Sequence, residues 1–196
     1  AGVAAGLGCA GGMASDGGGK LLIAEQLGSR VRRVDGAGII GTVAGTGRNV
    51  PDETSGPATS AWLGAEFIAV DGDGNVFLAR SNHVLRIDAV SGELSIVAGT
   101  GEDGFGGDGG PATAALLSRP SGIAVDADGH VFVADSGNRR IRRIDAATGI
   151  IETVAGGVSR SAGPSDIPFA LFDPIGLALD GRRRLYILAE TTPART

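Results

Sequence analysis

The stretch Gly122–Gly156, GIAVDADGHVFVADSGNRRIRRIDAATGIIETVAG, decides the fold. It contains four short runs rich in β-branched residues: Ile123–Val125, Val131–Val133, Ile141–Ile144 and Ile151–Val154. Runs of this composition predict strands. Turn-forming sequences separate them, and their Gly and Asn residues accept the positive φ angles of tight hairpins: Asp128-Gly129, Ser136-Gly137-Asn138 and Thr148-Gly149. The stretch therefore predicts a four-stranded antiparallel meander.

The same pattern recurs along most of the chain. Each predicted first strand ends in an aspartate, and these aspartates are spaced 55, 55 and 54 residues apart: Asp16, Asp71, Asp126 and Asp180. The predicted fourth strands end in Val-Ala-Gly, beginning at Val43, Val97 and Val154. So regular a period indicates that one supersecondary unit is stacked on its copies, because one thin sheet cannot cover both of its own faces.

Two stretches of the third repeat carry a resemblance to a known family. Residues 120–145, PSGIAVDADGHVFVADSGNRRIRRID, resemble an NHL repeat, and residues 97–113, VAGTGEDGFGGDGGPAT, are similar to the longer bacterial and teneurin-type version. The resemblance covers nearly the whole chain but is weaker in the first repeat, where Met13-Ala14-Ser15 replaces the usual aliphatic strand. It implies an all-β fold built from β-propeller blades of four antiparallel strands.

The resemblance divides the chain, as a single propeller segment of residues 1–196, into about three and a half blades. Blade 1 is expected at about 12–45, blade 2 at about 67–99, blade 3 at about 122–156 and a partial blade 4 at about 176–190. The long connections are expected at 46–66, 100–121 and 157–175. An arc of blades exposes an apolar face and an unpaired edge. We therefore interpret the chain as a fragment of a longer propeller or as a half-ring that a second copy completes.

The composition fits this fold and argues against some functions. Thirty-five glycines with only six phenylalanines and one tryptophan suit thin, turn-rich β-layers. A net charge of −5 argues against a general nucleic-acid binder. No apolar run approaches the roughly 20 residues that span a bilayer, so membrane insertion is not expected.

Two short motifs resemble ligand-binding sequences. Gly99–Gly104 satisfies the G-x-G-x-x-G dinucleotide string, but no helix is predicted after it, so we interpret it as part of the repeat. Asp71, Asp73 and Asn75 have the spacing of a calcium loop and are a candidate metal site. Because Lys20 occupies one of these positions in the first repeat, we favour a hairpin turn in which the aspartate accepts backbone amides. No cofactor is expected.

Residues suited to catalysis are scarce. The family that the sequence resembles includes peptide-amidating lyases that hold zinc through several histidines, whereas this chain has only His83 and His130, in different predicted loops. We expect both histidines at the surface. The sequence also lacks a Gly-x-Ser-x-Gly motif. The chain is therefore not predicted to be an enzyme, and a metal-dependent hydrolase or lyase is kept as an alternative.

Basic residues gather near the loops between second and third strands. The candidate binding residues there are Arg30, Asn138, Arg139 and Arg140. Some animal NHL propellers bind RNA through a basic end face, so RNA binding is a further alternative. Nucleic acid is nevertheless not the favoured partner, because aromatic stacking residues are scarce and the chain is acidic. We interpret Arg32 and Arg142, on third strands, as solvated residues paired with acidic groups.

The long connections are the remaining candidate binding segments, because connections of this length are uncommon without a structural or binding role. Ala58–Leu63 and Ala112–Leu117 each predict a short helical turn packed on a blade. Glu102, Asp103 and Asp108 lie among glycines and are candidates for binding a cation or a basic partner, although we favour a solvated tip.

The sequence thus predicts a non-catalytic β-propeller scaffold that presents loops for protein–protein interaction or self-assembly. The expected partner is another protein, or a second copy of the chain that completes the propeller. The compartment is not assigned, and the resemblance to long propellers of secreted and surface proteins favours a secreted or cell-surface parent protein.

Overall fold

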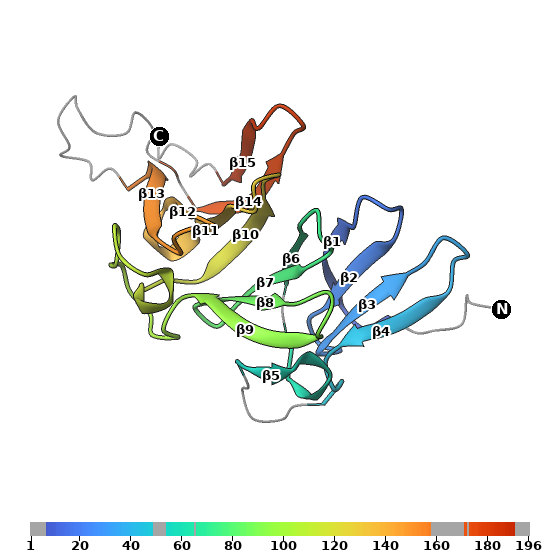
Figure 1. Cartoon of the computed structure of the whole chain (residues 1–196). Helices are drawn as coiled ribbons and strands as arrows, with labels where there is room; N and C mark the ends of the chain where they lie inside the picture. The colour runs from blue at the N-terminus through green and yellow to red at the C-terminus, as the bar shows by residue number, and fades with distance from the viewer. Residues whose placement is uncertain (1–6, 49–53, 65, 158–170, 172, 191–196) are drawn as a thin grey trace, which may run out of the picture. The chain divides into compact units, whose positions relative to one another are not determined.

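The computed structural model describes residues 7–48, 54–64, 66–157, 171 and 173–190 (Figure 1). Residues 49–53 of the first predicted connection and most of the third, 157–175, lie outside the described residues. The regular elements of the described part are β-strands and three short 3-10 helices. None of its helices is long and apolar enough to cross a membrane.

Three antiparallel meanders and one two-stranded hairpin form the blades. Blade 1 consists of β1 (Ala10–Ser15), β2 (Leu21–Glu25), β3 (Arg30–Val34) and β4 (Ile40–Ala44). Blade 2 consists of β6 (Phe67–Val70), β7 (Val76–Arg80), β8 (His83–Ile87) and β9 (Glu93–Ala98), with the added strand β5 (Gly56–Pro57) paired to β9. Blade 3 consists of β10 (Pro120–Val125), β11 (Val131–Asp135), β12 (Arg140–Ile144) and β13 (Ile151–Gly156). Blade 4 consists of β14 (Pro174–Leu179) and β15 (Leu185–Ala189).

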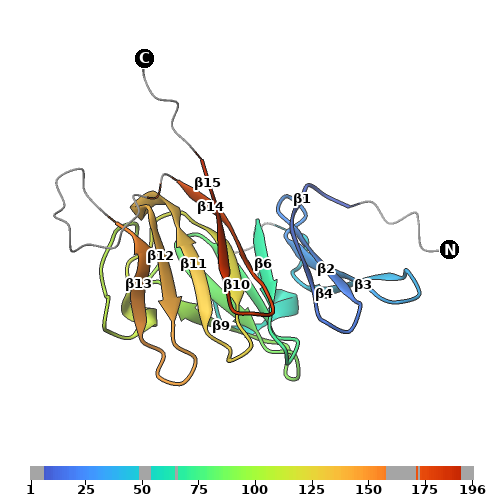
Figure 2. The same ribbon diagram turned by 90° about the horizontal axis from the view of Figure 1, so that it is seen from above.

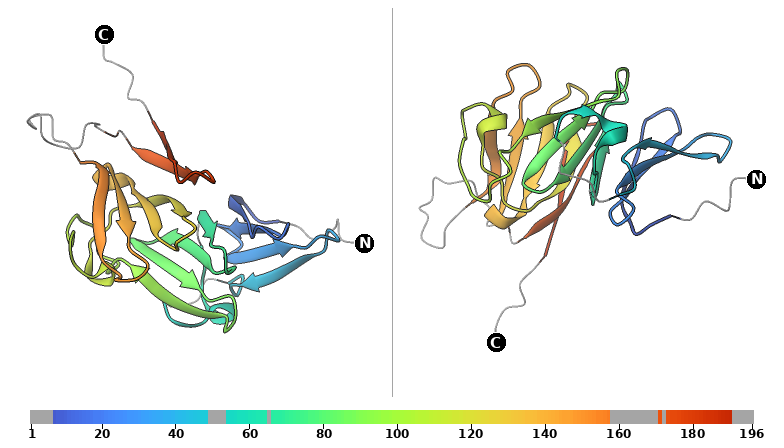
Figure 3. Two further views of the ribbon diagram at one scale, coloured as in Figure 1. Left: turned by 45° about the horizontal axis from the view of Figure 1, so that its top comes forward. Right: turned by 90° about the horizontal axis from the view of Figure 1, so that it is seen from below.

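The predicted all-β architecture of four-stranded blades is confirmed, including a first strand at Met13-Ala14-Ser15. The chain divides into two compact units. The first unit, Ala1–Arg80 with Val84–Val97, contains blade 1 and most of blade 2 (Figure 3). The second unit, Ser81–His83 with Ala98–Thr196, contains blades 3 and 4, and Figure 2 shows β10–β13 side by side in one sheet.

An aspartate closes the first hairpin of every blade. Asp16 Oδ1 accepts the amides of Gly18 and Lys20 at 2.9 and 3.0 Å. The aspartates at the same position of the other blades accept the amides two and four residues further on: Asp71, Asp126 and Asp180. These carboxylates satisfy amides that no strand partner reaches, so the hairpin-turn interpretation is confirmed.

A second aspartate closes the hairpin between the third and fourth strands. In blade 2, Asp88 Oδ1 accepts the amides of Ser91 at 2.8 Å and Val90 at 3.0 Å. These bonds, the Ser91 amide first, lower the pKa of Asp88 to about 2. Asp35 and Asp145 make equivalent bonds in blades 1 and 3. The turns are therefore built around ionised carboxylates.

The Val-Ala-Gly motif marks a close approach of two backbone segments. Its glycines, Gly45, Gly99 and Gly156, have φ angles of 89°, 91° and 80°, in the left-handed region. A Cβ at Gly99 would lie 2.1 Å from the carbonyl oxygen of Asn82. Only glycine fits both the angle and the space. Gly99 is also the first glycine of the dinucleotide string, which thus has a structural cause.

The predicted helical turns form as 3-10 helices, η1 (Ala58–Ser60) and η2 (Ala112–Ala114), shorter than expected. Ala58 accepts the amide of Gly45 at 2.8 Å and donates its own amide to Gly92 at 2.9 Å. Ala112 makes the same two bonds within the second unit, with Gly99 and Gly149. Each helix therefore fixes its connection between the end of one fourth strand and the last hairpin of the following blade.

Packing in the first unit joins the two faces of neighbouring blades. Leu22, Ala24 and Val31 of blade 1 share one hydrophobic core with Leu78 and Leu85 of blade 2. The connection adds its own residues to this core: Ala58, Ala61 and Leu63. Burial of about 25 cal/mol per Å² of apolar surface is the main stabilising contribution here. The connection is consequently part of the core of the unit.

We expect Gly99→Ala to lower the free energy of unfolding by about 3 kcal/mol, because the new Cβ meets a carbonyl oxygen and the backbone angle is strained. Gly41→Ala is the control, since Gly41 also lies in the last strand of a blade but has open space at its Cβ and no left-handed angle. Urea denaturation measures both. Equal effects of the two substitutions would contradict the close approach.

The lowered pKa of Asp88 predicts a specific acid dependence. The stabilisation from the ionised carboxylate is present above the unfolded-state pKa of 3.8 and is lost as the pH falls towards about 2. Asp88→Asn should therefore lose less stability than the wild type between about pH 4 and pH 2. Asp73→Asn is the control, because the exposed Asp73 carboxylate accepts no hydrogen bond from the described residues. Urea midpoints measured across this pH range would contradict the prediction if both variants behaved alike.

Candidate functional site

A buried ion pair lies at the end of β11 in blade 3. The side chains of Asp135 and Arg142 are both 0% exposed, and Arg142 Nη1 lies 3.3 Å from Asp135 Oδ2. Asp135 also accepts the Ser118 amide at 2.7 Å and the Asn138 side-chain amide at 2.8 and 2.9 Å. Burial raises the pKa of the Asp135 carboxyl, while these donors and Arg142 act in the opposite direction. The hydrogen bonds make this buried carboxylate tolerable.

Arg142 also holds the second connection, whose residues 101–118 we call the blade-3 loop. Its guanidinium donates to the carbonyl oxygen of Gly106 at 3.1 Å and lies 2.8 Å from Asp108 Oδ1. The other oxygen of Asp108 accepts the Thr153 hydroxyl at 2.7 Å. Arg142 therefore pairs with one carboxylate from its own blade and one from the loop. Our expectation that Arg142 is solvated is wrong, because the loop covers it.

Three further contacts hold the same loop. The ring of Phe105 lies over the guanidinium of Arg140, 3.9 Å from its centroid, and Asn138 Nδ2 donates to the Gly104 carbonyl at 2.8 Å. Arg140 in turn donates to the carbonyl oxygen of Gly157 at 3.2 Å. The favoured solvated tip is thus wrong for residues 104–108. Three predicted site residues, Asn138, Arg140 and Asp108, lie together there and bind the protein's own loop.

The other predicted residues lie apart from this cluster. Arg139 is exposed, has a left-handed φ of 55° and lies 3.9 Å from Asp173. Glu102 and Asp103 are exposed near the start of the loop. Arg30 begins β3 in the first unit. Arg139, Glu102 and Asp103 remain available to solvent, whereas Arg140 and Asp108 are engaged.

The corresponding positions of blades 1 and 2 show two other arrangements. In blade 1, Glu25 accepts the Gly8 amide at 3.2 Å and lies 3.6 Å from Arg32, which repeats the Asp135–Arg142 pair. In blade 2, Leu85 occupies the arginine position, and the residue at the end of β7 is Arg80. The Arg80 guanidinium donates to the Trp62 carbonyl and lies over the Trp62 ring, 4.7 Å from its centroid. A change at one position is thus accompanied by a change at the other.

The histidines differ from expectation. His83 is buried, with its ring against Gly101, so its predicted surface position is wrong. The glycine leaves the space that the ring fills, since a Cβ there would lie 2.7 Å from it. His130 is half-buried, and its Nδ1 accepts the Ala146 amide at 3.1 Å. Both rings have structural surroundings.

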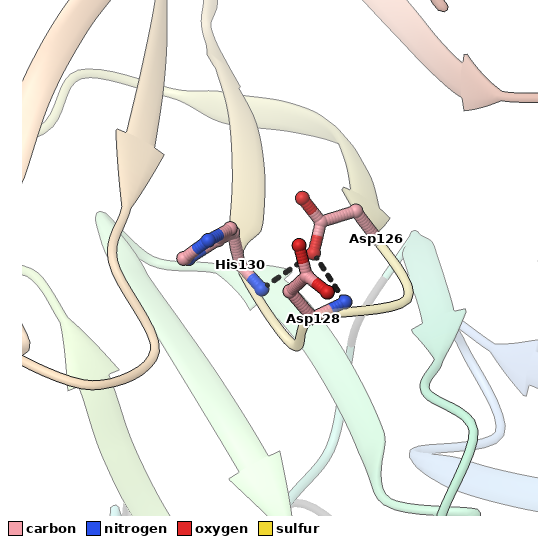
Figure 4. Close-up of side chains that lie close together, drawn as sticks. All are labelled: Asp126, Asp128 and His130. Carbon is pink, nitrogen blue, oxygen red and sulfur yellow. Dashed lines mark hydrogen bonds between the residues drawn. The ribbon is translucent and has the colours of Figure 1, made fainter. Parts of the chain in front are cut away.

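One group of side chains in the described part could hold a metal ion: Asp126, Asp128 and His130 in the β10–β11 hairpin (Figure 4). These residues already have other partners. Asp126 Oδ1 accepts two backbone amides, and Arg183 lies 2.7 Å from Asp128. His130 would have to bind through Nε2. The donors fit a cation poorly, because two of them already serve the turn and the third pairs with a cation.

The predicted candidate Asp71, Asp73 and Asn75 occupies the same hairpin of blade 2. Asp71 Oδ1 accepts the amides of Asp73 and Asn75, and its Oδ2 accepts the Asn75 side-chain amide at 2.7 Å. Both carboxylate oxygens of Asp71 therefore serve the turn. A metal ion would have to replace these bonds.

Sequence reasoning did not identify the Asp135–Arg142 pair, although a signal was present. In repeats 1 and 3, an acidic residue at the end of the second strand is followed seven residues later by arginine: Glu25 with Arg32, and Asp135 with Arg142. The two residues lie on adjacent antiparallel strands, which brings them together. The repeated spacing, more than the charge of either residue, was informative.

Residues 100–171 match the family model of the teneurin NHL domain. The chain is 36% identical over 126 residues to teneurin-4 of Homo sapiens, covering 57% of this chain and 4% of that protein. It is 40% identical over 79 residues to the chloroplastic protein SUPPRESSOR OF QUENCHING 1 of Arabidopsis thaliana, covering 39% of this chain and 7% of that protein. The chain carries NHL repeats of the teneurin type. It spans less than a tenth of these curated relatives.

Solved structures extend the similarity to nearly the whole chain. A streptogramin B lyase structure superposes with a TM-score of 0.62 at 15% identity, covering 96% of this chain and 50% of that one. A gluconolactonase from Xanthomonas campestris gives 0.61 at 16% identity, covering 92% and 54%. At this identity the likeness concerns the fold, and the NHL-repeat blades are those of a β-propeller.

We expect Arg142→Ala to lower the free energy of unfolding by about 3–5 kcal/mol, because it leaves Asp135 buried without its cation. It should also release the blade-3 loop, so that amide hydrogen exchange at residues 104–110 becomes faster. Arg143→Ala is the matched control on the same strand. Arg143 makes only partly exposed ion pairs with Asp145 and Glu152, for which we expect a change below about 1 kcal/mol. Unchanged loop exchange in Arg142→Ala would contradict the role of Arg142.

Proposed function

We propose that this chain is a non-catalytic β-propeller scaffold that binds protein partners, further copies of itself included, through exposed blade surfaces and loops. The observation that carries the proposal is an uncovered apolar face on blade 4. Tyr186 is 52% exposed and Leu188 is 64% exposed, both on one face of β15. The counterpart of Leu188 in blade 3, Ala134, is completely buried. Exposed apolar faces of this kind mark interaction sites.

Blade 1 presents a second such face. Met13 is 64% exposed, and Leu21 on the neighbouring strand is also exposed. The residues at the same positions of blade 3, Ile123 and Val131, are buried. These are faces that blades normally cover with another sheet, so they suit a protein partner better than a small polar ligand.

The use of polar groups supports a structural scaffold. The hairpin aspartates accept backbone amides, and the buried charges of blade 3 bind a loop of the same chain. A catalytic acid or base needs a free position towards a substrate. The bonds of these carboxylates to their own backbone fit a supporting role.

A metal-dependent hydrolase or lyase is the second candidate. It is favoured by the grouping of Asp126, Asp128 and His130 and by the lyase and gluconolactonase among the structures with this fold. The partners of these three side chains weigh against it. Stoichiometric metal in the purified protein, together with hydrolysis of a lactone, would favour this candidate over the scaffold.

Self-association tests the scaffold proposal. We expect light scattering on a sizing column to show a mass that rises over about two orders of magnitude in concentration. Tyr186→Ser with Leu188→Ser should weaken this association roughly tenfold or more, because apolar contact area is lost. Val90→Ser is the control, since Val90 is exposed but lies in a hairpin of blade 2. A mass that stays monomeric, with no protein bound by the apolar faces, would contradict the proposal.

A further inference from the structure

The way in which blade 3 holds its loop provides a template within the chain. We call the contact residues the blade-3 receptor: Asp135, Arg140, Arg142, Ile151 and Thr153. The arginines bind Phe105, the Gly106 carbonyl and Asp108. The backbone of Ile151 adds two hydrogen bonds, from Gly109 at 2.8 Å and to Gly110 at 3.1 Å.

Blade 1 contains the same set of groups. Its members, which we call the blade-1 receptor, are Glu25, Arg30, Arg32, Ile40 and Thr42. The strand registers make the correspondence exact at each position: Arg32 pairs with Thr42 as Arg142 pairs with Thr153, Glu25 with Arg30 as Asp135 with Arg140, and Val34 with Ile40 as Ile144 with Ile151. Both arginines, the threonine and the isoleucine are identical in the two receptors.

The blade-1 receptor is more open than its counterpart. The Arg32 side chain is 13% exposed, whereas Arg142 is 0% exposed, and Thr42 is exposed. Arg142 lies beside two carboxylates, but Arg32 lies beside one, Glu25, among the described residues. No described residue makes an ion pair with Arg30 or bonds the outward N–H and C=O of Ile40. Blade 1 therefore offers positive charge and an open strand edge where blade 3 binds a loop.

Blade 2 provides the contrasting case. Leu85 and Ile96 stand where blades 1 and 3 have arginine and threonine. The connection before blade 2 has the same length as the blade-3 loop, but Pro51 and Thr54 replace Phe105 and Asp108 in its sequence. Receptor and loop sequences thus change together, which indicates that the polar receptor is specific for a loop with phenylalanine and aspartate.

We propose that the blade-1 receptor binds a glycine-rich polypeptide segment that carries phenylalanine and, three residues later, aspartate, presented by a partner protein. This inference rests on the proposed binding function and names its partner chemistry. The aromatic ring stacks on Arg30, and the carboxylate pairs with Arg32 and accepts the Thr42 hydroxyl. The glycines let the backbone approach the edge of β4 and bond Ile40.

The probe is a synthetic peptide with the sequence of residues 101–119, GEDGFGGDGGPATAALLSR. It is added to the full chain and followed by NMR, which detects weak binding. We expect saturable shifts of the amide signals of Ile40, Gly41 and Thr42. Arg32→Ala should weaken binding roughly tenfold or more, because the peptide carboxylate loses its cation. Arg33→Ala, an exposed neighbour on the same strand, is the matched control and should leave binding unchanged.

Two peptide variants test the proposal without changing the protein. Replacing the phenylalanine by alanine, or the aspartate by asparagine, should each weaken binding roughly tenfold. Binding that is equal in Arg32→Ala and wild type, or shifts at Ile151 instead of Ile40, would overturn the proposal. So would the absence of peptide binding with Arg32-dependent self-association, which would assign the receptor to a second copy. Neither failure affects the test on Tyr186 and Leu188, so the two proposals can fail separately.

Discussion

Arg142 carries a full positive charge in the interior of blade 3, and an interior charge is tolerated only among opposite charges and hydrogen-bond acceptors. Asp135 supplies one carboxylate from the same sheet, and Asp108 supplies the other from the connection. The need to neutralise this arginine therefore fixes the path of a long glycine-rich segment. Phe105 and the loop carbonyls then complete a cover that the segment could not form by its own hydrophobicity.

The three four-stranded blades satisfy the same position in different ways. Blades 1 and 3 place an acidic residue at the end of the second strand and arginine on the third. Blade 2 has leucine on the third strand, and its Arg80 turns to a carbonyl and an indole ring instead. The hairpins and the Val-Ala-Gly joints are nevertheless alike. Backbone geometry is thus kept constant while the side chains under each connection vary.

Most of the blade architecture could be predicted from the sequence, because alternating apolar residues and turn-forming glycines act locally. The meander Gly122–Gly156 and the hairpin aspartates are examples. The burial of Arg142 and His83 could not be predicted, since it depends on segments distant in sequence, Asp108 for one and Gly101 for the other. Two-residue pairing at Gly56–Pro57 is likewise too short to leave a periodic signal. The candidate residues Asn138, Arg140 and Asp108 were recognised as polar and close to a loop, but their partner within the chain was not.

The match between each connection and the blade that it covers defines the unit of this fold. A blade-3 loop transferred to blade 2 would bring Asp108 against Leu85 and Ile96, where no cation is available. The segment that can be duplicated or exchanged intact consequently begins at the loop, near residue 100, and ends with the Val-Ala-Gly of its own blade. Recombination at the first strand would separate a loop from its receptor. Chains of this kind can gain or lose whole blades without new side-chain contacts only if the breakpoints fall immediately after a Val-Ala-Gly.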